Sequence, residues 1–199
     1  MIVQAENVGM NQYKIKEGLS VQELIDSIPQ TAFDTSFKYN SSHVQAATNR
    51  ISIREAVKRP LKLKEVFTHY KYPQSCFMEV YNTPVFKQSA AIRGFLGWFH
   101  KTYGGQHYRS AIAILPPGKS VQQHIDGGPY YSDKDRFHLV LQGNYEYTVA
   151  GESREWKAGD LFWFDNKKEH SSISTGKVDR MAFIFDVQGS RWRDECGIK

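Results

Sequence analysis

Cysteine, long apolar runs and low-complexity segments are scarce or missing in this 199-residue sequence, and each gap narrows the class of protein. The two cysteines, Cys76 and Cys196, have no spacing typical of a metal site, so we expect free thiols in a reducing, cytoplasmic compartment. No apolar run approaches the roughly 18 residues needed to cross a bilayer. The first residues lack a basic segment followed by an apolar run, so a secretory signal is not expected.

The composition favours a globular domain rich in β-structure. The 26 Lys and Arg residues against 21 Asp and Glu residues give a net charge of +5. Phe, Tyr and Trp, at 12, 11 and 4 residues, are more typical of a β-rich barrel than of a helical bundle. We predict a single domain over residues 1–199, in which a helix-rich part (1–105) packs on a barrel core (106–188).

The N-terminal half carries helix signals. Two capping boxes, in which Glu follows Ser by three positions, each predict a helix that ends before a proline. A longer segment has an apolar stripe and ends at two glycines. We therefore predict helices from Ser20 to Pro29, from Ser52 to Pro60 and from Lys87 to Tyr103.

From Arg109 onward the pattern changes to short strands separated by turn residues. Such strands fit a sandwich or a barrel. The predicted strands are 110–115, 124–126, 136–141, 144–149, 159–164 and 180–187, with a hairpin turn at 150–152. The fold class predicted is α+β, mainly β, with helices that buttress a barrel.

The most informative motif is His124-Ile-Asp126, followed 44 positions later by His170. Residues i and i+2 of a strand point to the same face, so His124 and Asp126 can aim at one point. Two histidines and one carboxylate can hold one face of Fe(II) and leave the other face open. The same set also suits Zn²⁺ with a bound water.

Arg180 begins the apolar strand 181–187. A buried guanidinium is costly unless an anion meets it, and its planar fork suits a carboxylate. Arg180 therefore predicts a clamp for the far carboxylate of a 2-oxo diacid, next to a non-haem iron site. A solvated strand end is the alternative.

A second basic pair lies in the strand 136–141. Arg136 and His138 alternate with Phe137, Leu139 and Leu141, so one face is apolar and the other is polar. The polar face is either solvated or, beside a metal site, a second contact for an anion.

These motifs resemble the aspartyl/asparaginyl β-hydroxylase family. The sequence from Arg136 to Leu139 looks like its R-x-H-L element, and the resemblance extends from about Tyr108 to Val187. The other matching residues are Trp156, Gly159, Phe164, Asp165, His170, Arg180 and Asp186. The family consists of Fe(II)- and 2-oxoglutarate-dependent dioxygenases on a double-stranded β-helix, a jelly-roll barrel.

The resemblance implies a role for each residue. His124, Asp126 and His170 would bind Fe(II), Arg180 would bind the C5 carboxylate of 2-oxoglutarate, and Arg136 and His138 would line the cosubstrate pocket. O2 would be the oxidant, with succinate and CO2 as co-products. Animal members have glycine in place of Asp126, and the complete triad looks more like bacterial members, some of which hydroxylate free amino acids such as proline. The resemblance therefore implies that the substrate is a small molecule, a peptide or a protein side chain.

Three other interpretations stay open. They are a zinc hydrolase, a non-enzymatic cupin-like protein that binds a metal or small ligand, and a nucleic-acid-binding module. The last rests on residues 50–71, where seven basic residues face two acidic ones, a pattern more typical of a solvated helix face. The loop 127–135, rich in glycine and tyrosine, is either a lid over the site or a plain surface loop.

Overall fold

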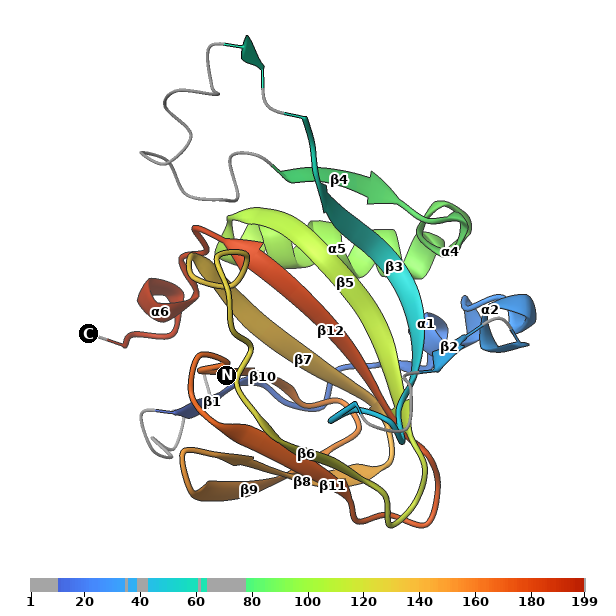
Figure 1. Ribbon diagram of the computed structural model, residues 1–199. Helices are drawn as coiled ribbons and strands as arrows, with labels where there is room; N and C mark the ends of the chain where they lie inside the picture. Colours follow the sequence, from blue (N-terminus) through green and yellow to red (C-terminus); the bar gives the residue numbers. More distant parts are fainter. Residues whose placement is uncertain (1–10, 35, 39–42, 61, 64–77, 199) are drawn as a thin grey trace.

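The computed structural model describes residues 11–34, 36–38, 43–60, 62–63 and 78–198. Two antiparallel sheets dominate it (Figure 1). The larger sheet has the order β1 (Gln12–Lys16), β10 (Leu161–Phe164), β7 (Lys134–Gln142), β12 (Arg180–Gln188), β5 (Gln106–Leu115), β3 (Asn49–Lys58), β2 (Phe37–Lys38), and β4 (Met78–Asn82) also pairs with β3. The smaller sheet has the order β6 (Ser120–His124), β11 (His170–Ser174), β8 (Asn144–Val149), β9 (Glu152–Lys157).

The chain passes back and forth between the two sheets. From β5 to β8 successive strands alternate between the larger and the smaller sheet, and β10 to β12 alternate again. The smaller sheet lies across one face of the larger sheet (Figure 1). This is the double-stranded β-helix, or jelly roll, that the sequence predicted.

Strict alternation along the central strands separates two hydrophobic cores. On β7, Phe137, Leu139 and Leu141 point to the outer core beneath the helices, whereas Val140 belongs to the inner core between the sheets. The inner core is largely aromatic and is formed by Val140, Tyr145, Tyr147, Val149, Trp156, Phe162 and Phe164. His138, two residues before Val140 on the same strand and buried, therefore projects into a mainly aromatic interior.

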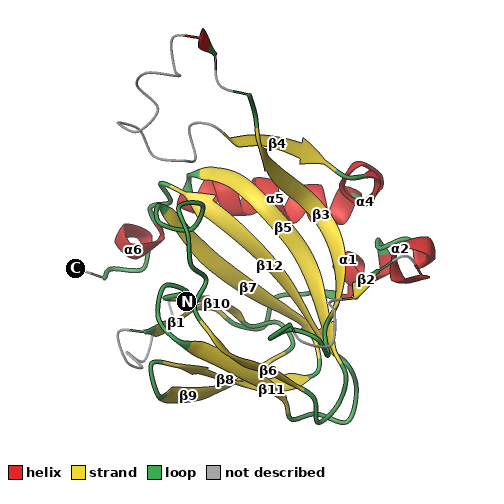
Figure 2. Ribbon diagram, in the orientation of Figure 1, coloured by secondary structure: helices red, strands yellow, loops and turns green. Residues whose placement is uncertain are grey.

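Helices cover the outer face of the larger sheet (Figure 2). The longest is α5 (Ala90–Tyr103), where the Phe99 ring lies 4.8 Å from Phe137 and 4.9 Å from Phe185, centroid to centroid. The shorter helices are α1 (Gln22–Asp26), α2 (Gln30–Asp34), α4 (Pro84–Gln88) and the C-terminal α6 (Trp192–Glu195). The prediction that N-terminal helices buttress the barrel is confirmed.

The helix predicted from Ser52 to Pro60 is wrong. This segment lies in β3, which pairs with β5 on one side and with β4 on the other. Ile51 and Ile53 are buried at a spacing of two, the period of a strand. Strand pairing on both sides therefore overrides the local capping signal, and the basic residues of 50–58 lie on a strand.

Two other helix boundaries also differ from the prediction. The segment from Lys87 to Tyr103 is divided at Ser89, whose hydroxyl accepts a hydrogen bond from the Ile92 N–H (3.0 Å) and begins α5. Helix α1 begins at Gln22 and has no side-chain cap, so the box at Ser20 does not form. Glycine does end α5, because Gly104 takes a φ of 71°.

Strands from the N-terminal half also belong to the barrel. β1 pairs with β10 and β3 pairs with β5, so residues before 105 extend the larger sheet on both sides. None of the described helices is both long and apolar enough to cross a membrane. Cys196 is a free thiol, whereas Cys76 lies outside the described residues.

Candidate metal centre and an adjoining anion pocket

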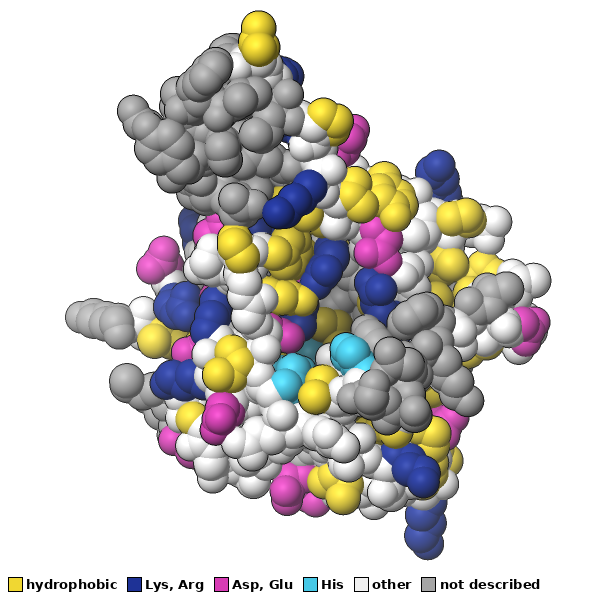
Figure 3. Space-filling view, in the orientation of Figure 1, with side chains coloured by type: hydrophobic (Ala, Val, Ile, Leu, Met, Phe, Trp, Pro, Cys, Tyr) yellow, Lys and Arg dark blue, Asp and Glu magenta, His cyan; other side chains and the backbone are white. Residues whose placement is uncertain are grey.

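The two histidines of the motif come from neighbouring strands of the smaller sheet. His124 is the last residue of β6 and His170 is the first of β11, and the two are paired in register. Their ring centroids lie 4.3 Å apart. Figure 3 shows histidine side chains reaching the surface in the middle of one face, between the two sheets. The 44-residue separation between Asp126 and His170 in the sequence is thus closed by strand pairing.

Asp126 lies just beyond the end of β6, not within the strand predicted for 124–126. Its backbone N–H donates to the Asn166 carbonyl (3.0 Å), which turns the carboxylate toward the histidines. One oxygen, Oδ1, lies 3.8 Å from His124 Nε2, and the other, Oδ2, lies 3.8 Å from His170 Nε2. The potential ligand atoms of the three residues all lie within 4.8 Å of one another, a spacing that fits one metal ion.

The ring orientation of both histidines is fixed by the same local contact. His124 Nδ1 lies 2.8 Å from the Gln122 carbonyl, and His170 Nδ1 lies 2.9 Å from the Lys168 carbonyl. A carbonyl only accepts, so each Nδ1 carries the proton and each Nε2 presents a lone pair to the triad. Metal-binding histidines are commonly oriented in this way.

Burial and charge keep His170 and Asp126 in the protonation states that a metal needs. Burial lowers the pKa of His170 to about 4, so its imidazole is neutral at pH 7. Burial alone would raise the pKa of Asp126, but the Arg136 guanidinium and His170 outweigh it and the pKa is lowered. The centre therefore contains the neutral imidazole of His170 beside the carboxylate of Asp126.

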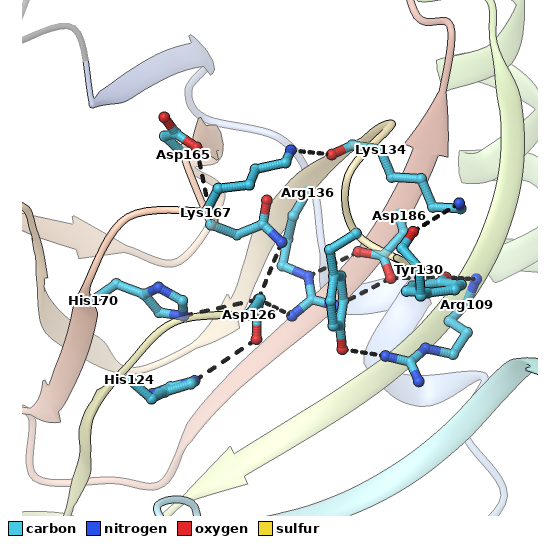
Figure 4. Close-up of polar contacts among 12 residues, drawn as sticks. Arg109, His124, Asp126, Tyr130, Lys134, Arg136, Asp165, Lys167, His170 and Asp186 are labelled. Carbon is cyan, nitrogen blue, oxygen red and sulfur yellow. Dashed lines mark hydrogen bonds and ion pairs between the residues drawn. The ribbon is translucent and has the colours of Figure 1, made fainter. Parts of the chain in front are cut away.

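Arg136 joins Asp126 to a second buried carboxylate (Figure 4). Its Nη1 donates to Asp126 Oδ2 (2.5 Å), while Nε and Nη2 donate to the two oxygens of Asp186 at 2.8 and 3.0 Å. Burial would lower the pKa of Arg136, but both carboxylates raise it well above its usual value. Every nitrogen of this guanidinium thus has a carboxylate partner.

Arg180, in contrast to Arg136, is buried without a carboxylate partner among the described residues. It is 2% exposed, and no hydrogen-bond partner meets its buried Nε among the described residues. No described carboxylate forms an ion pair with it, and its guanidinium lies over the Tyr145 ring, 4.6 Å from the centroid. Burial lowers the pKa of Arg180. A buried cation without an anion is the feature expected of a site that receives one.

His138 lies in the same interior and is 3% exposed. Its Nδ1 is 3.2 Å from the Tyr145 hydroxyl, and the rings of Phe162 and Phe164 surround it. Burial and the nearby cations lower its pKa well below the usual value, so it is a neutral hydrogen-bonding group.

One pocket brings these groups together. His124, Arg136, His138, His170 and Arg180 all line it, with Asp126 beside it. The six residues singled out from the sequence thus converge, although they come from β6, β7, β11, β12 and the loop after β6. The lining also includes Gln45, Thr48, Ala113, Val121, Tyr147, Ser172 and Ile184.

The predicted loop 127–135, whose last two residues belong to β7, is held against the barrel by residues that the sequence did not single out. The Tyr130 hydroxyl accepts from the Arg109 backbone N–H (3.1 Å) and donates to Asp186 Oδ2 (3.0 Å). The Arg109 guanidinium lies 4.3 Å from the Tyr130 ring centroid and donates to the Tyr131 hydroxyl. In the sequence, these contacts were signalled only by the two adjacent tyrosines, Tyr130 and Tyr131, that follow Gly128 and Pro129. Whether the loop acts as a lid stays a prediction.

One family model agrees with the motifs. The model of the aspartyl/asparaginyl β-hydroxylase family matches residues 91–189. No curated protein matches the chain. Among solved structures, similarity is found to the cupin domain of Cnp3 from Schizosaccharomyces pombe, with 16% identity and a TM-score of 0.36 over 46% of this chain and 63% of that one.

A predicted oxalate decarboxylase from Thermotoga maritima is also similar, with 24% identity and a TM-score of 0.36 over 46% of this chain and 72% of that one. A cupin superfamily protein from Desulfitobacterium hafniense has 19% identity and a TM-score of 0.33, over 40% of this chain and 66% of that one. The chain thus spans less than two thirds of the Cnp3 domain. Over residues 91–189, about half of its length, the chain belongs to the aspartyl/asparaginyl β-hydroxylase family.

Proposed function

We propose that this protein is an Fe(II)- and 2-oxoglutarate-dependent dioxygenase that hydroxylates an unactivated C–H bond of an amino acid, a peptide or a protein side chain. The observation that carries the proposal is the buried guanidinium of Arg180, which has no carboxylate partner among the described residues and lines the same pocket as His124 and His170. A metal triad and an unpaired cation in one cavity are complementary to an anionic chelating ligand.

The donor set fits Fe(II). Two imidazole nitrogens with free lone pairs and one carboxylate oxygen form a facial triad, which leaves the opposite face of a six-coordinate metal for other ligands. His124, Asp126 and His170 would hold the ion. Asp126 supplies an anionic ligand, which suits a divalent cation.

The charged and hydrogen-bonding groups beyond the triad suit 2-oxoglutarate. Arg180 would bind the C5 carboxylate through its planar fork, a geometry in which the desolvated charge gains an anion. His138, neutral and fixed by Tyr145, would donate a hydrogen bond from its other nitrogen. When bound, Fe(II) with 2-oxoglutarate and O2 supplies the oxidising chemistry and yields succinate and CO2 as co-products.

The chain itself places the reactants and excludes water. Tyr147 and Phe164 pack against His170, with ring centroids 6.0 and 5.1 Å away, so the inner side of the site is closed by aromatic surface. His124 lies on the partly exposed side, and a substrate would approach from there. The loop 127–135, which directly follows Asp126, would border that approach.

Two other functions make different demands on the pocket. A zinc hydrolase needs three protein ligands and a water, and gives no reason for an unpaired buried arginine. A non-enzymatic cupin-like protein would bind a ligand without consuming it.

The cytoplasmic location that the sequence predicts stays a prediction.

The test is turnover of 2-oxoglutarate. Fe(II)-loaded protein is incubated aerobically with 2-oxoglutarate and a panel of free L-amino acids and short peptides, and succinate is measured. We expect succinate in the wild type, increased by a substrate in the panel, none with Asp126→Ala, and much less with Arg180→Gln at limiting 2-oxoglutarate. Binding of 2-oxoglutarate with no succinate under any condition would replace this proposal by the binding protein. Hydrolytic activity that requires Zn²⁺ would replace it by the hydrolase.

A further inference from the structure

A continuous chain of hydrogen bonds runs from the loop 127–135 to the carboxylate of the triad (Figure 4). Tyr130 donates to Asp186 Oδ2 (3.0 Å), Asp186 accepts twice from Arg136, and Arg136 donates to Asp126 Oδ2 (2.5 Å). These residues come from the loop, β12 and β7, so the chain links three separate parts of the barrel.

The members of this chain are largely removed from water. Asp186 is 1% exposed and Asp126 is 8% exposed, and the Arg136 side chain is 13% exposed. Charged hydrogen bonds are short and directional, and solvent does not compete strongly for them in such surroundings. The orientation of Arg136 is therefore set by the bidentate contact with Asp186, and Arg136 in turn orients Asp126.

The contacts at Asp126 leave only one of its oxygens for a metal. Oδ2 accepts from Arg136 Nη1 and also from Asn166 Nδ2 (3.2 Å), and these two donors use the two lone pairs of that oxygen. Oδ1 has no hydrogen-bond donor among the described residues and faces His124. The carboxylate is thus prepared to bind through Oδ1 alone.

We propose that Arg136 is a positioning residue for the metal ligand Asp126 and is not a contact of the cosubstrate. The proposal rests on the proposed function, because it assumes that the triad binds a metal. It gives the two basic groups of the pocket different roles, since Arg136 orients the metal ligand and Arg180 binds the anion. It also links Tyr130 of the loop to the triad through Asp186 and Arg136.

The two roles separate in a binding experiment that needs no turnover. Co(II) is titrated into the metal-free wild type, Arg136→Gln and Arg180→Gln, and the dissociation constant is read from the visible absorption of Co(II). 2-Oxoglutarate is then titrated into each protein saturated with Co(II). Arg180→Gln is the matched control, since it removes a cation from the same pocket.

We expect Arg136→Gln to weaken Co(II) binding by about 10- to 100-fold, the usual effect of losing a residue that orients a ligand. The affinity of its Co(II)-saturated form for 2-oxoglutarate should change little. Arg180→Gln should do the reverse. A weaker 2-oxoglutarate affinity with unchanged Co(II) affinity in Arg136→Gln would overturn the proposal. Failure of the wild type to bind 2-oxoglutarate would instead count against the proposed function.

Two further variants separate positioning from folding, because Arg136→Gln leaves Asp186 buried without its cation. Arg136→Gln with Asp186→Asn removes both charges, and we expect this folded double variant to keep the weak Co(II) affinity. Arg136→Lys keeps a cation but lacks the fork that holds both carboxylates, and we expect roughly ten-fold weaker Co(II) binding. Co(II) affinity equal to the wild type in either folded variant would refute a positioning role.

Discussion

The two arginines that reach the pocket from neighbouring strands of the larger sheet are in opposite states. Arg136, on β7, meets two carboxylates, Asp126 and Asp186, and each of its nitrogens donates to one of them. Arg180, at the start of β12, is at least as buried and has no carboxylate partner among the described residues. Asp186 lies six residues along the same strand, about 20 Å away at an ordinary strand rise.

This contrast teaches which part of the pocket is complete in the chain alone. Every nitrogen of the Arg136 guanidinium has a carboxylate partner, and the triad carboxylate is held in place before any metal binds. Around Arg180 the charge is uncompensated, which costs folding free energy and is tolerated where a ligand offsets it. The metal end is thus preorganised, and the anion end is completed by a ligand.

The largest expected effect is on metal affinity, at Asp126 in the metal-binding end of the pocket. Asp126→Ala removes the only anionic ligand of the triad, so metal affinity should fall by more than the roughly 100-fold upper range for residues that merely orient a ligand. Metal titration of the purified variant measures this. Asp165→Ala, which removes a nearby carboxylate outside the triad, is the control. Equal metal affinity in the wild type and Asp126→Ala would show that the triad is not the metal site.

Loss of the charge at Arg180 should lower the affinity for 2-oxoglutarate and raise the stability of the ligand-free protein. Arg180→Met keeps the apolar stem and removes the charge, so 2-oxoglutarate affinity should fall by roughly 10- to 100-fold, the worth of hydrogen bonds to a charged group. Without ligand, the same variant should be more stable by about 1 kcal/mol, or about 2–4 °C in Tm. Arg193→Met, at a largely exposed site, is the control. A clear loss of stability would mean that Arg180 is already paired.

Acidification should weaken the folded state through His170. Its pKa is about 4 in the folded chain, against an ordinary value near 6.5 when unfolded. The unfolded state therefore binds more protons between these values, and the stability that His170 contributes is lost as the pH falls through this window. Each bound proton gives a slope of up to about 1.4 kcal/mol per pH unit.

Urea denaturation of metal-free protein between pH 5 and pH 6 tests this prediction. We expect the free energy of unfolding to fall less steeply with decreasing pH in His170→Gln than in the wild type. Identical slopes would show that the imidazole of His170 is not kept neutral by burial.

The smallest effect should come from Tyr145. Tyr145→Phe removes the hydroxyl that lies 3.2 Å from His138 Nδ1 but keeps the ring beneath Arg180. One hydrogen bond is worth about 1 kcal/mol, so 2-oxoglutarate should bind about five-fold more weakly. Calorimetric titration of the metal-loaded protein measures the change. A loss as large as that of Arg180→Met would place Tyr145 in direct contact with the ligand.

The sequence predicted the barrel, and the six residues that it singled out lie in or beside one pocket. Alternation along 136–141 predicted the two faces of β7, and the family motifs identified residues that the fold brings into one pocket. The helix at Ser52–Pro60 failed because a capping box is a local signal, whereas β3 is fixed by pairing with β4 and β5.

What the sequence could not predict are partners across strands. Arg136 and Asp186 lie 50 positions apart and meet only because β7 and β12 pair in that register. Arg109 and Tyr130 meet across β5 and the loop in the same way. Distances of this kind depend on the register of strands, which no short motif encodes.

The central claim is that the triad and Arg180 together bind a metal and 2-oxoglutarate in one pocket. The most direct measurement is an anaerobic absorbance titration of the Fe(II)-loaded protein with 2-oxoglutarate. The account predicts a weak visible charge-transfer band in the wild type, which bidentate chelation of Fe(II) produces, and a much higher half-saturating concentration with Arg180→Gln. No band in wild-type protein with verified iron loading would contradict it.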